Sequence, residues 1–126
     1  MRRFSLLFAA TALLALLLQP AAFADEKQDL SVLYVGNVDT PRAQAFAEFL
    51  RQNFRKAETA ARGGFDPKQA EGFDVVLLDW SQADRGDLTT NASPLGPRDS
   101  WTRPTVLLGS AGLLIATPWQ TNGAYG

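Results

Sequence analysis

The sequence predicts an α/β domain, a parallel β-sheet with helices on both of its faces. Short and continuously apolar runs recur along the chain, which is typical of strands buried on both faces. A long amphipathic stretch and a shorter helical signal lie between these runs. Strands that alternate with helices favour parallel pairing, because each crossover returns the chain to the same end of the sheet.

The first predicted strand covers residues 31–35 (SVLYV). This run is apolar and β-branched in part, and it ends at Gly36 and Asn37. Its length and composition indicate a strand buried within the sheet.

A helix is predicted over residues 41–56. Thr40 is a good N-cap, and Pro41 fits the first helical position. Phenylalanines and Leu50 recur at helical spacing on one side, so we expect this side to pack in the core. Arg42 belongs to the opposite, polar side.

The next part of the chain predicts two weaker elements and one strong one. Residues 57–62 indicate a short edge strand, and residues 66–71 a single helical turn. The run FDVVLLDW at 73–80 is the strongest strand signal in the chain. Its aliphatic centre suits a central strand that is covered on both faces.

Residues 81–103 are rich in Gly, Pro, Ser, Asp and Asn and lack apolar periodicity, so we predict a loop of about 23 residues. Residues 105–109 (TVLLG) predict a further buried strand. The segment 110–117 fits either a short helix capped by Ser110 or another strand, and Pro118 ends it.

Taken in order, these elements predict a flavodoxin-like, three-layer domain with right-handed crossovers and strand order 2-1-3-4. A complete domain of this class has a fifth strand and a closing helix. Neither is visible before Gly126. We therefore hypothesise that the gene product is incomplete at its C-terminal end.

Residues 1–24 have the three parts of a cleavable secretory signal peptide. Arg2 and Arg3 supply positive charge, residues 5–18 are apolar, and a small-x-small pattern ends at Ala24. The apolar run is shorter than a membrane-spanning helix requires. We expect an exported protein, periplasmic or secreted, without a membrane segment after cleavage and with one domain at 25–126.

The amino-acid composition limits the kinds of binding and catalysis that this chain can perform. The leader takes two of the 12 basic residues and none of the 13 acidic ones, so the remaining 102 residues carry a net charge of −3. An acidic chain is not expected to bind nucleic acid. The chain lacks Cys and His, so it has no thiolate nucleophile, no zinc-thiolate site and no histidine base. We expect no cofactor, no metal and no catalytic residue.

Ligands of open parallel sheets bind beyond the carboxyl ends of the strands. Three segments should meet there and bind a small polar ligand through backbone and polar side-chain groups. The predicted site residues are Gly36, Asn37, Asp39, Thr40, Asp79, Ser81, Gly109 and Ser110. We do not expect Ser110 to be a nucleophile, because the usual activating base is missing.

The run VLYVG at 32–36, the following helix and the run FDVVLLD at 73–79 resemble the class I glutamine amidotransferase-like superfamily, and within it the ThuA-like proteins. The resemblance covers residues 31–115. Catalytic members use a cysteine on an elbow and a histidine, and this chain has neither. The resemblance therefore implies a non-catalytic relative, or a fragment without its active half, that binds a carbohydrate or another small polar ligand.

Two alternatives remain open. The same segments resemble a response-regulator receiver, in which Asp79 would accept phosphate, although Gly36 and Asn37 stand where that family has an acidic pair. The domain could instead be a protein–protein interaction module. Its anchors would be the three tryptophans, which lie in or beside loops.

Overall fold

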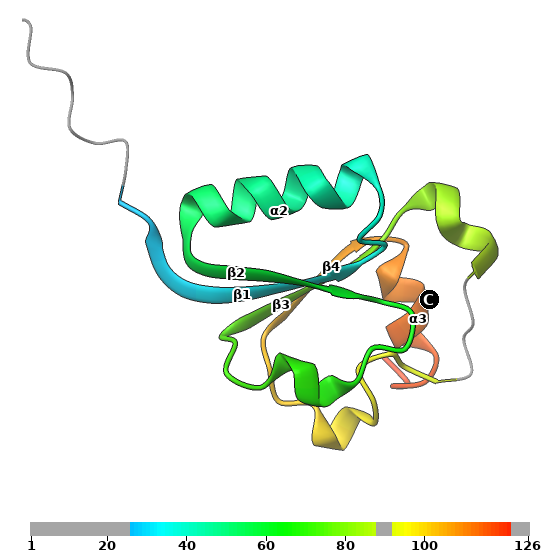
Figure 1. The fold of residues 1–126 in the computed structure, drawn as a ribbon. Helices are drawn as coiled ribbons and strands as arrows, with labels where there is room; N and C mark the ends of the chain where they lie inside the picture. The colour runs from blue at the N-terminus through cyan, green and yellow to red at the C-terminus, as the bar shows by residue number, and fades with distance from the viewer. Residues whose placement is uncertain (1–25, 88–91, 122–126) are drawn as a thin grey trace, which may run out of the picture.

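The computed structural model describes residues 26–87 and 92–121. Its centre is an all-parallel sheet of four strands in the order β2-β1-β3-β4 (Figure 1). The strands are β1 (Gln28–Gly36), β2 (Phe54–Ala61), β3 (Val75–Trp80) and β4 (Thr105–Gly109). The predicted α/β flavodoxin-like class and the strand order are both confirmed.

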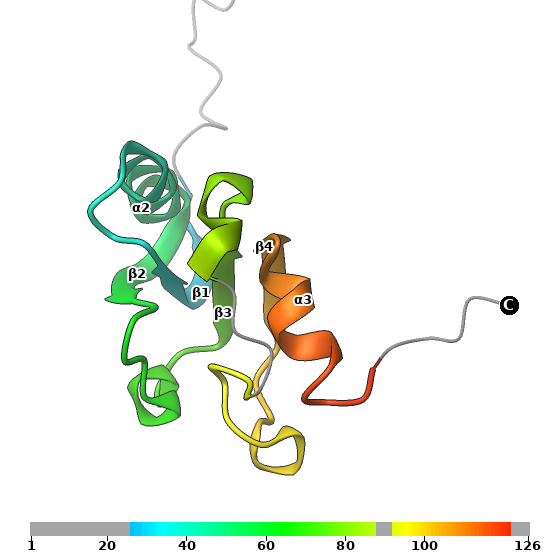
Figure 2. The same ribbon diagram turned by 90° about the vertical axis from the view of Figure 1, so that its right-hand side faces the viewer.

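Helices lie on the two faces of this sheet. The helix α2 (Pro41–Asn53) covers one face over β1 and β2, and α3 (Ala111–Ala116) lies on the other face beside β4 (Figure 2). The short 3₁₀ segment η2 (Pro67–Ala70) joins β2 to β3. The predicted helical turn at 66–71 is thus present, with Asp66 as its cap.

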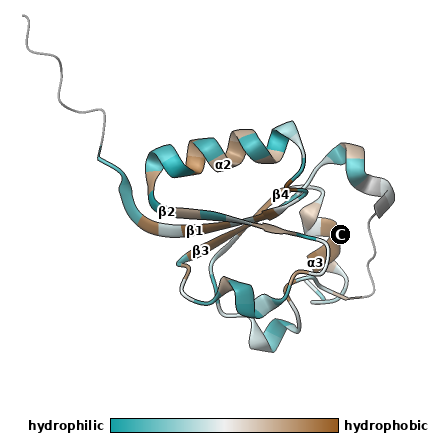
Figure 3. Cartoon of the chain, in the orientation of Figure 1, coloured by the Kyte–Doolittle hydropathy of each residue, from teal (hydrophilic) through white to brown (hydrophobic). Residues whose placement is uncertain are grey.

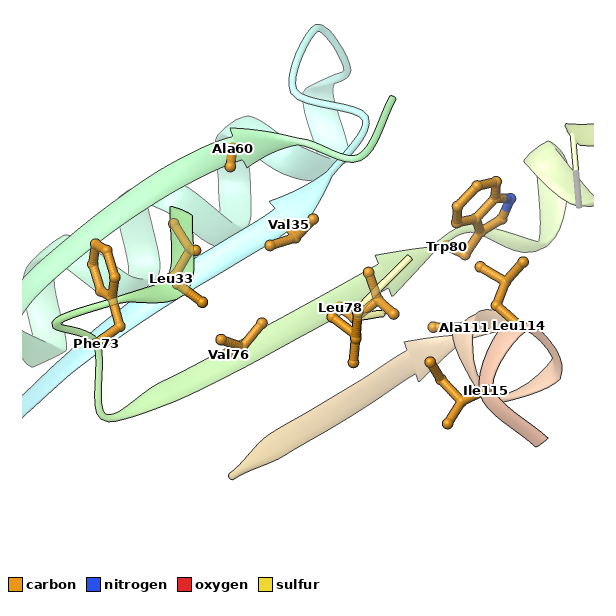
Figure 4. Close-up of a cluster of buried hydrophobic side chains, with 12 residues drawn as sticks. Leu33, Val35, Ala60, Phe73, Val76, Leu78, Trp80, Ala111, Leu114 and Ile115 are labelled. Atoms are coloured by element: carbon orange, nitrogen blue, oxygen red, sulfur yellow. The ribbon is translucent and has the colours of Figure 1, made fainter. Parts of the chain in front are cut away.

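Side-chain alternation along the strands divides the core into two clusters. Val32 and Tyr34 of β1 face α2 and pack with Ala43 and Leu50. The larger cluster lies on the α3 face, where side chains of β1 and β3 meet α3 and the loops (Figure 4). Hydropathy colouring shows that β3 and β4 are mainly apolar, whereas polar and apolar residues alternate along α2 (Figure 3).

The helix α2 is shorter than predicted. Its N-cap is Thr40 as expected, with the hydroxyl oxygen accepting a hydrogen bond from the Ala43 amide at 3.2 Å. It ends at Asn53, however, and β2 begins directly at Phe54. Residues 54–56 pair with β1 instead, because strand pairing overrides the helical pattern there.

Two other strands also begin at residues that differ from the prediction. β1 begins at Gln28, where three exposed residues precede the buried part. β3 begins at Val75 rather than at residue 73. The predicted strand at 105–109 matches β4 at both ends.

The region 81–103 is not structureless, which corrects the prediction of a plain loop. It contains two 3₁₀ segments, η3 (Gln82–Asp87) and η4 (Arg98–Ser100). Leu95 is buried in the larger core cluster, which ties this region to the sheet. A single apolar residue gives no periodic signal, so the sequence pattern does not reveal this contact. Residues 88–91 lie outside the described part.

The ambiguous segment 110–117 forms the helix α3. Ala111, Leu114 and Ile115 are buried at helical spacing on the core. Ser110 occupies the N-cap position, but its hydroxyl makes no capping hydrogen bond.

The predicted signal peptide at 1–24 lies outside the described residues. Within 26–87 and 92–121, no helix has the length and apolar character needed to span a bilayer.

Candidate functional site

A pocket of about 310 Å³ lies at the carboxyl ends of β1 and β3, beside the first turn of α2. This is the end of the sheet at which the sequence predicts a ligand. Its lining residues are Tyr34, Asn37, Thr40, Pro41, Arg42, Arg62, Asp79, Ser81, Ala83 and Asp84.

Asp79 is the most buried carboxylate of this pocket, with 3% of its surface exposed. Its Oδ2 accepts hydrogen bonds from the Tyr34 hydroxyl at 2.6 Å and from Arg42 Nε at 2.8 Å. Its Oδ1 accepts from Arg42 Nη2 at 3.0 Å. Arg42 therefore binds the carboxylate in a two-pronged geometry, the strong form of this interaction.

Strand register brings these groups together. Tyr34 of β1 pairs with Leu77 of β3, and Asp79 follows Leu77 by two residues on the same face. That face carries α2, whose first turn supplies Arg42.

Gly36 makes room for the Tyr34 ring. A Cβ atom at position 36 would lie 2.7 Å from the Tyr34 hydroxyl oxygen and from an edge carbon of its ring. Since real Cβ atoms do not approach other atoms so closely, a side chain there would displace the phenol from Asp79. Gly36 thus contributes to the site by being small rather than by contacting a ligand.

The protonation of this group is set by burial and by mutual contact. Burial raises the pKa of the Tyr34 hydroxyl, and its hydrogen bond to Asp79 raises that pKa further. The hydrogen bond to Asp79 also raises the pKa of Arg42. Near neutral pH the site therefore holds a neutral phenol and a charged guanidinium.

A second wall of the pocket is organised by Asp84. Its Oδ2 accepts a hydrogen bond from the Ser81 hydroxyl at 2.8 Å and lies 3.3 Å from Arg62 Nη2. The Arg62 guanidinium stacks on the Trp80 ring, with its carbon 3.8 Å from the ring centroid. Only 9% of the Arg62 side chain is exposed, because Asp84 and the Trp80 ring both contact it.

Four of the eight predicted site residues line the pocket, namely Asn37, Thr40, Asp79 and Ser81. Gly36 lies behind Tyr34, and Asp39 is exposed on the turn before α2. The remaining two, Gly109 and Ser110, belong to the end of a different strand, β4.

Gly109 and Ser110 lie at the end of β4 and do not line this pocket. The Ser110 hydroxyl donates to Gln82 Oε1 at 2.7 Å, and its amide donates to the Trp80 carbonyl at 2.7 Å. These bonds fasten the start of α3 to the end of β3. The prediction placed the ends of β1, β3 and β4 at one site, whereas the residues that line this pocket follow β1, β3 and β2, with Arg62 directly after β2.

Six lining residues were not among the predicted site residues, and four of these carry polar or charged side-chain groups: Tyr34, Arg42, Arg62 and Asp84. Tyr34 lies in an apolar run and was assigned to the core. Arg42 was placed on the polar side of the helix, yet its guanidinium reaches Asp79 while 44% of the side chain stays exposed. An arginine in the first turn of a helix is a signal that could have been used, because a cation there is unfavourable unless a carboxylate compensates it.

In the described part of the chain, no group of three or more acidic side chains is arranged to hold a metal ion. No family model, curated protein or solved structure matches this chain.

Proposed function

We propose that this chain is an exported binding module that holds a small, neutral and hydroxyl-rich ligand, of the carbohydrate class, at the ends of β1 and β3. The observation that carries the proposal is the pocket of about 310 Å³ with the bonded Tyr34–Asp79–Arg42 group on its floor. A pocket of this volume suits a ligand of one sugar ring or two.

Charge balance favours a neutral ligand. The ionised side chains of the lining are two arginines and two aspartates, and they pair as Arg42 with Asp79 and Arg62 with Asp84. Because the charges of the lining balance, the pocket offers no net charge that would attract a charged ligand. A hydroxyl-rich ligand can instead use the remaining donor and acceptor capacity of the paired groups.

Neutral polar groups complete the lining. The Asn37 side chain combines a donor with an acceptor. The Thr40 and Ser81 hydroxyls donate to the Asn37 carbonyl and to Asp84, and they keep acceptor capacity for a ligand hydroxyl. This chemistry agrees with the carbohydrate binding that the ThuA-like resemblance implies.

The serine at the end of β4 does not suggest catalysis. The acceptor of the Ser110 hydroxyl is the Gln82 amide oxygen, which cannot take up a proton as a base does. The proposed activity is therefore binding alone.

The contacts of Asp79 and of the tryptophans weigh against the two alternatives. Both carboxylate oxygens of Asp79 accept hydrogen bonds, and only 3% of the residue is exposed, so a phosphodonor has poor access. Trp80 is buried, and Trp101 and Trp119 pack against the larger core cluster. These tryptophans are poor candidates for exposed partner anchors.

Titration of the exported chain with glucose, galactose and trehalose, followed by isothermal calorimetry and by amide NMR shifts, tests the proposal. Glucuronate and glucosamine are the charged comparators. We expect saturable binding of at least one neutral sugar, with shifts at residues 36–42 and 79–84. Binding should be weaker for both charged comparators.

Asn37→Ala should weaken the binding about fivefold, since one hydrogen bond is lost. Asn53→Ala is the matched control, because Asn53 is exposed at the far end of α2. No saturable binding of any neutral sugar, or tighter binding of glucuronate than of glucose, would contradict the proposal.

A further inference from the structure

The outer edge of β4 is unusual for an exposed strand edge. Within residues 26–87 and 92–121, β4 pairs only with β3 and is the outermost strand on the side away from β2 (Figure 2). Val106 is 45% exposed and Leu107 is 41% exposed. Leu113 of α3, the helix that follows β4, is also exposed, at 49%.

The opposite edge of the sheet differs in character. β2 carries exposed charged side chains, including Arg55, Lys56 and Glu58. Charges on an edge strand are a common protection against pairing with another chain. The strand β4 (TVLLG) has no charged residue, so this edge lacks that protection.

Backbone alternation shows which groups β4 presents outward. The Pro104 carbonyl accepts from the Val76 amide, and the Ser110 amide donates to the Trp80 carbonyl. The backbone N–H and C=O groups of the even-numbered residues of β4 therefore point toward β3. The amide and carbonyl groups of Thr105 and Leu107 must point to the outer edge.

We propose that β4 pairs with β4 of a second copy of this chain, antiparallel and centred on Leu107, so that two sheets join into one. In this register Leu107 lies opposite its counterpart, and Thr105 lies opposite Gly109. These are the positions whose backbone groups point outward, so each pair can exchange two hydrogen bonds.

The side chains match as well as the backbone. Val106 lies on the α2 face, because its partner Leu77 packs with α2, and it would meet Leu108 of the second copy. Leu107 lies on the α3 face beside Leu78 and would meet itself. Apolar groups thus meet apolar groups on both faces, and no like charges are brought together.

Self-matching of this kind is what a two-fold interface requires, since one patch must complement itself. A single strand of an unrelated partner would need a matching apolar pattern on both faces. The second copy has that pattern by identity.

Light scattering on the full chain, expressed with its own leader and recovered as the cell processes it, measures the association. We expect the mass of two chains, with dissociation on dilution. Leu107→Lys should weaken the dimer tenfold or more, because two ammonium groups would face each other across the pair. Thr59→Lys, on the exposed edge strand β2, is the matched control and should leave the mass unchanged.

A cysteine variant keeps the test decisive if the lysine variant does not fold. The chain has no cysteine, so Leu107→Cys introduces a single thiol. Opposed Cα atoms of a hydrogen-bonded antiparallel pair lie about 5.5 Å apart, within disulfide range. Mild oxidation should crosslink Leu107→Cys much faster than Thr59→Cys.

The mass of one chain at every concentration from micromolar to millimolar would overturn the proposal. A dimer that persists in folded Leu107→Lys would do the same, and so would equal crosslinking of the two cysteine variants.

Discussion

Asp79 and Arg42 form an ion pair whose two members are not equivalent. The carboxylate is 3% exposed, whereas 44% of the arginine side chain reaches solvent. If Asp79 is replaced by a neutral residue, the Arg42 guanidinium can reorient toward the solvent. If Arg42 is replaced by a neutral residue, the Asp79 carboxylate stays buried, and among the described residues it keeps the Tyr34 hydroxyl as its side-chain hydrogen-bond partner.

We therefore expect Arg42→Met to destabilise the protein more than Asp79→Asn does. A buried charge left alone costs about 3 kcal/mol, whereas loss of hydrogen bonds to a neutral amide costs about 1 kcal/mol. Urea unfolding measures both free energies. Arg51→Met, on an exposed site of the same helix, is the control and should stay close to the parent. A larger loss in Asp79→Asn would contradict this assignment.

Asp74 gives the fold a pH dependence on the acid side. The backbone amide of Ser31 and then its hydroxyl, both 2.7 Å from Oδ2, hold the Asp74 pKa below its ordinary value. The folded state thus binds protons less readily than the unfolded state. The stabilisation is present above the unfolded pKa of about 3.9 and is lost as pH falls through the folded value.

Acidification should therefore destabilise the parent protein more steeply than Asp74→Asn, which cannot lose this ionisation. Free energies of unfolding measured from neutral to acid pH test this. Ser31→Ala, which removes the hydroxyl but keeps the amide, should lie between the two. Parallel curves for the parent and Asp74→Asn would contradict the expectation.

At the scale of elements, two glycines near the β4–α3 junction have opposite roles. Gly109 has φ +62°, and a Cβ atom there would overlap the Trp80 carbonyl oxygen. Gly112 lies within α3, and a Cβ atom there would meet open space. The first must be glycine, whereas the second only adds flexibility to the unfolded chain.

Gly109→Ala should lower the free energy of unfolding by about 2 kcal/mol or more, and Gly112→Ala should raise it by about 0.5–1 kcal/mol. Denaturant unfolding of the two variants, compared with the parent, measures the signs. The same sign for both would contradict the roles assigned to these glycines.

Elements with a continuous or periodic apolar pattern were predictable from the sequence. β4 matched at both ends, and the cap of α2 at Thr40 was correct. The end of α2 was not predictable, because the pairing of Phe54 with Gln28 depends on a residue 26 positions earlier. The burial of Leu95 is equally non-local, as it depends on contacts with distant strands.

The candidate site was predictable in its place but not in its chemistry. The rule for parallel sheets located the carboxyl ends of the strands, and four of the predicted residues line the pocket. Tyr34 and Arg42 become site residues only through strand register and helix position. Neither of these can be obtained from local composition.

At the scale of the whole molecule, the protection of backbone amides against hydrogen exchange should decrease from the centre of the sheet to its edges. β1 pairs with both β2 and β3, and its residues from Ser31 to Val35 are buried. Local opening is least favourable where buried contacts are densest.

Hydrogen exchange should therefore be slowest at the amides of β1 and β3. In the Leu107→Lys variant, the outer edge of β4 should be unpaired. The amides of residues 105 and 107, which point to that edge, should therefore exchange fast in this variant. Mass spectrometry or NMR measures these rates. Stronger protection of β2 than of β1 would contradict this order.

Because α2 ends at Asn53 and β2 begins at Phe54, the orientation of the α2 side chains and the side-chain register of β2 depend on each other. One inserted residue there would either turn the helix by about 100° relative to the sheet or exchange the two faces of β2. The turn at Gly63 and Gly64 is exposed and borders open space, so it can absorb an added residue. Length variation in this domain is therefore expected at that turn and not at the helix–strand junction.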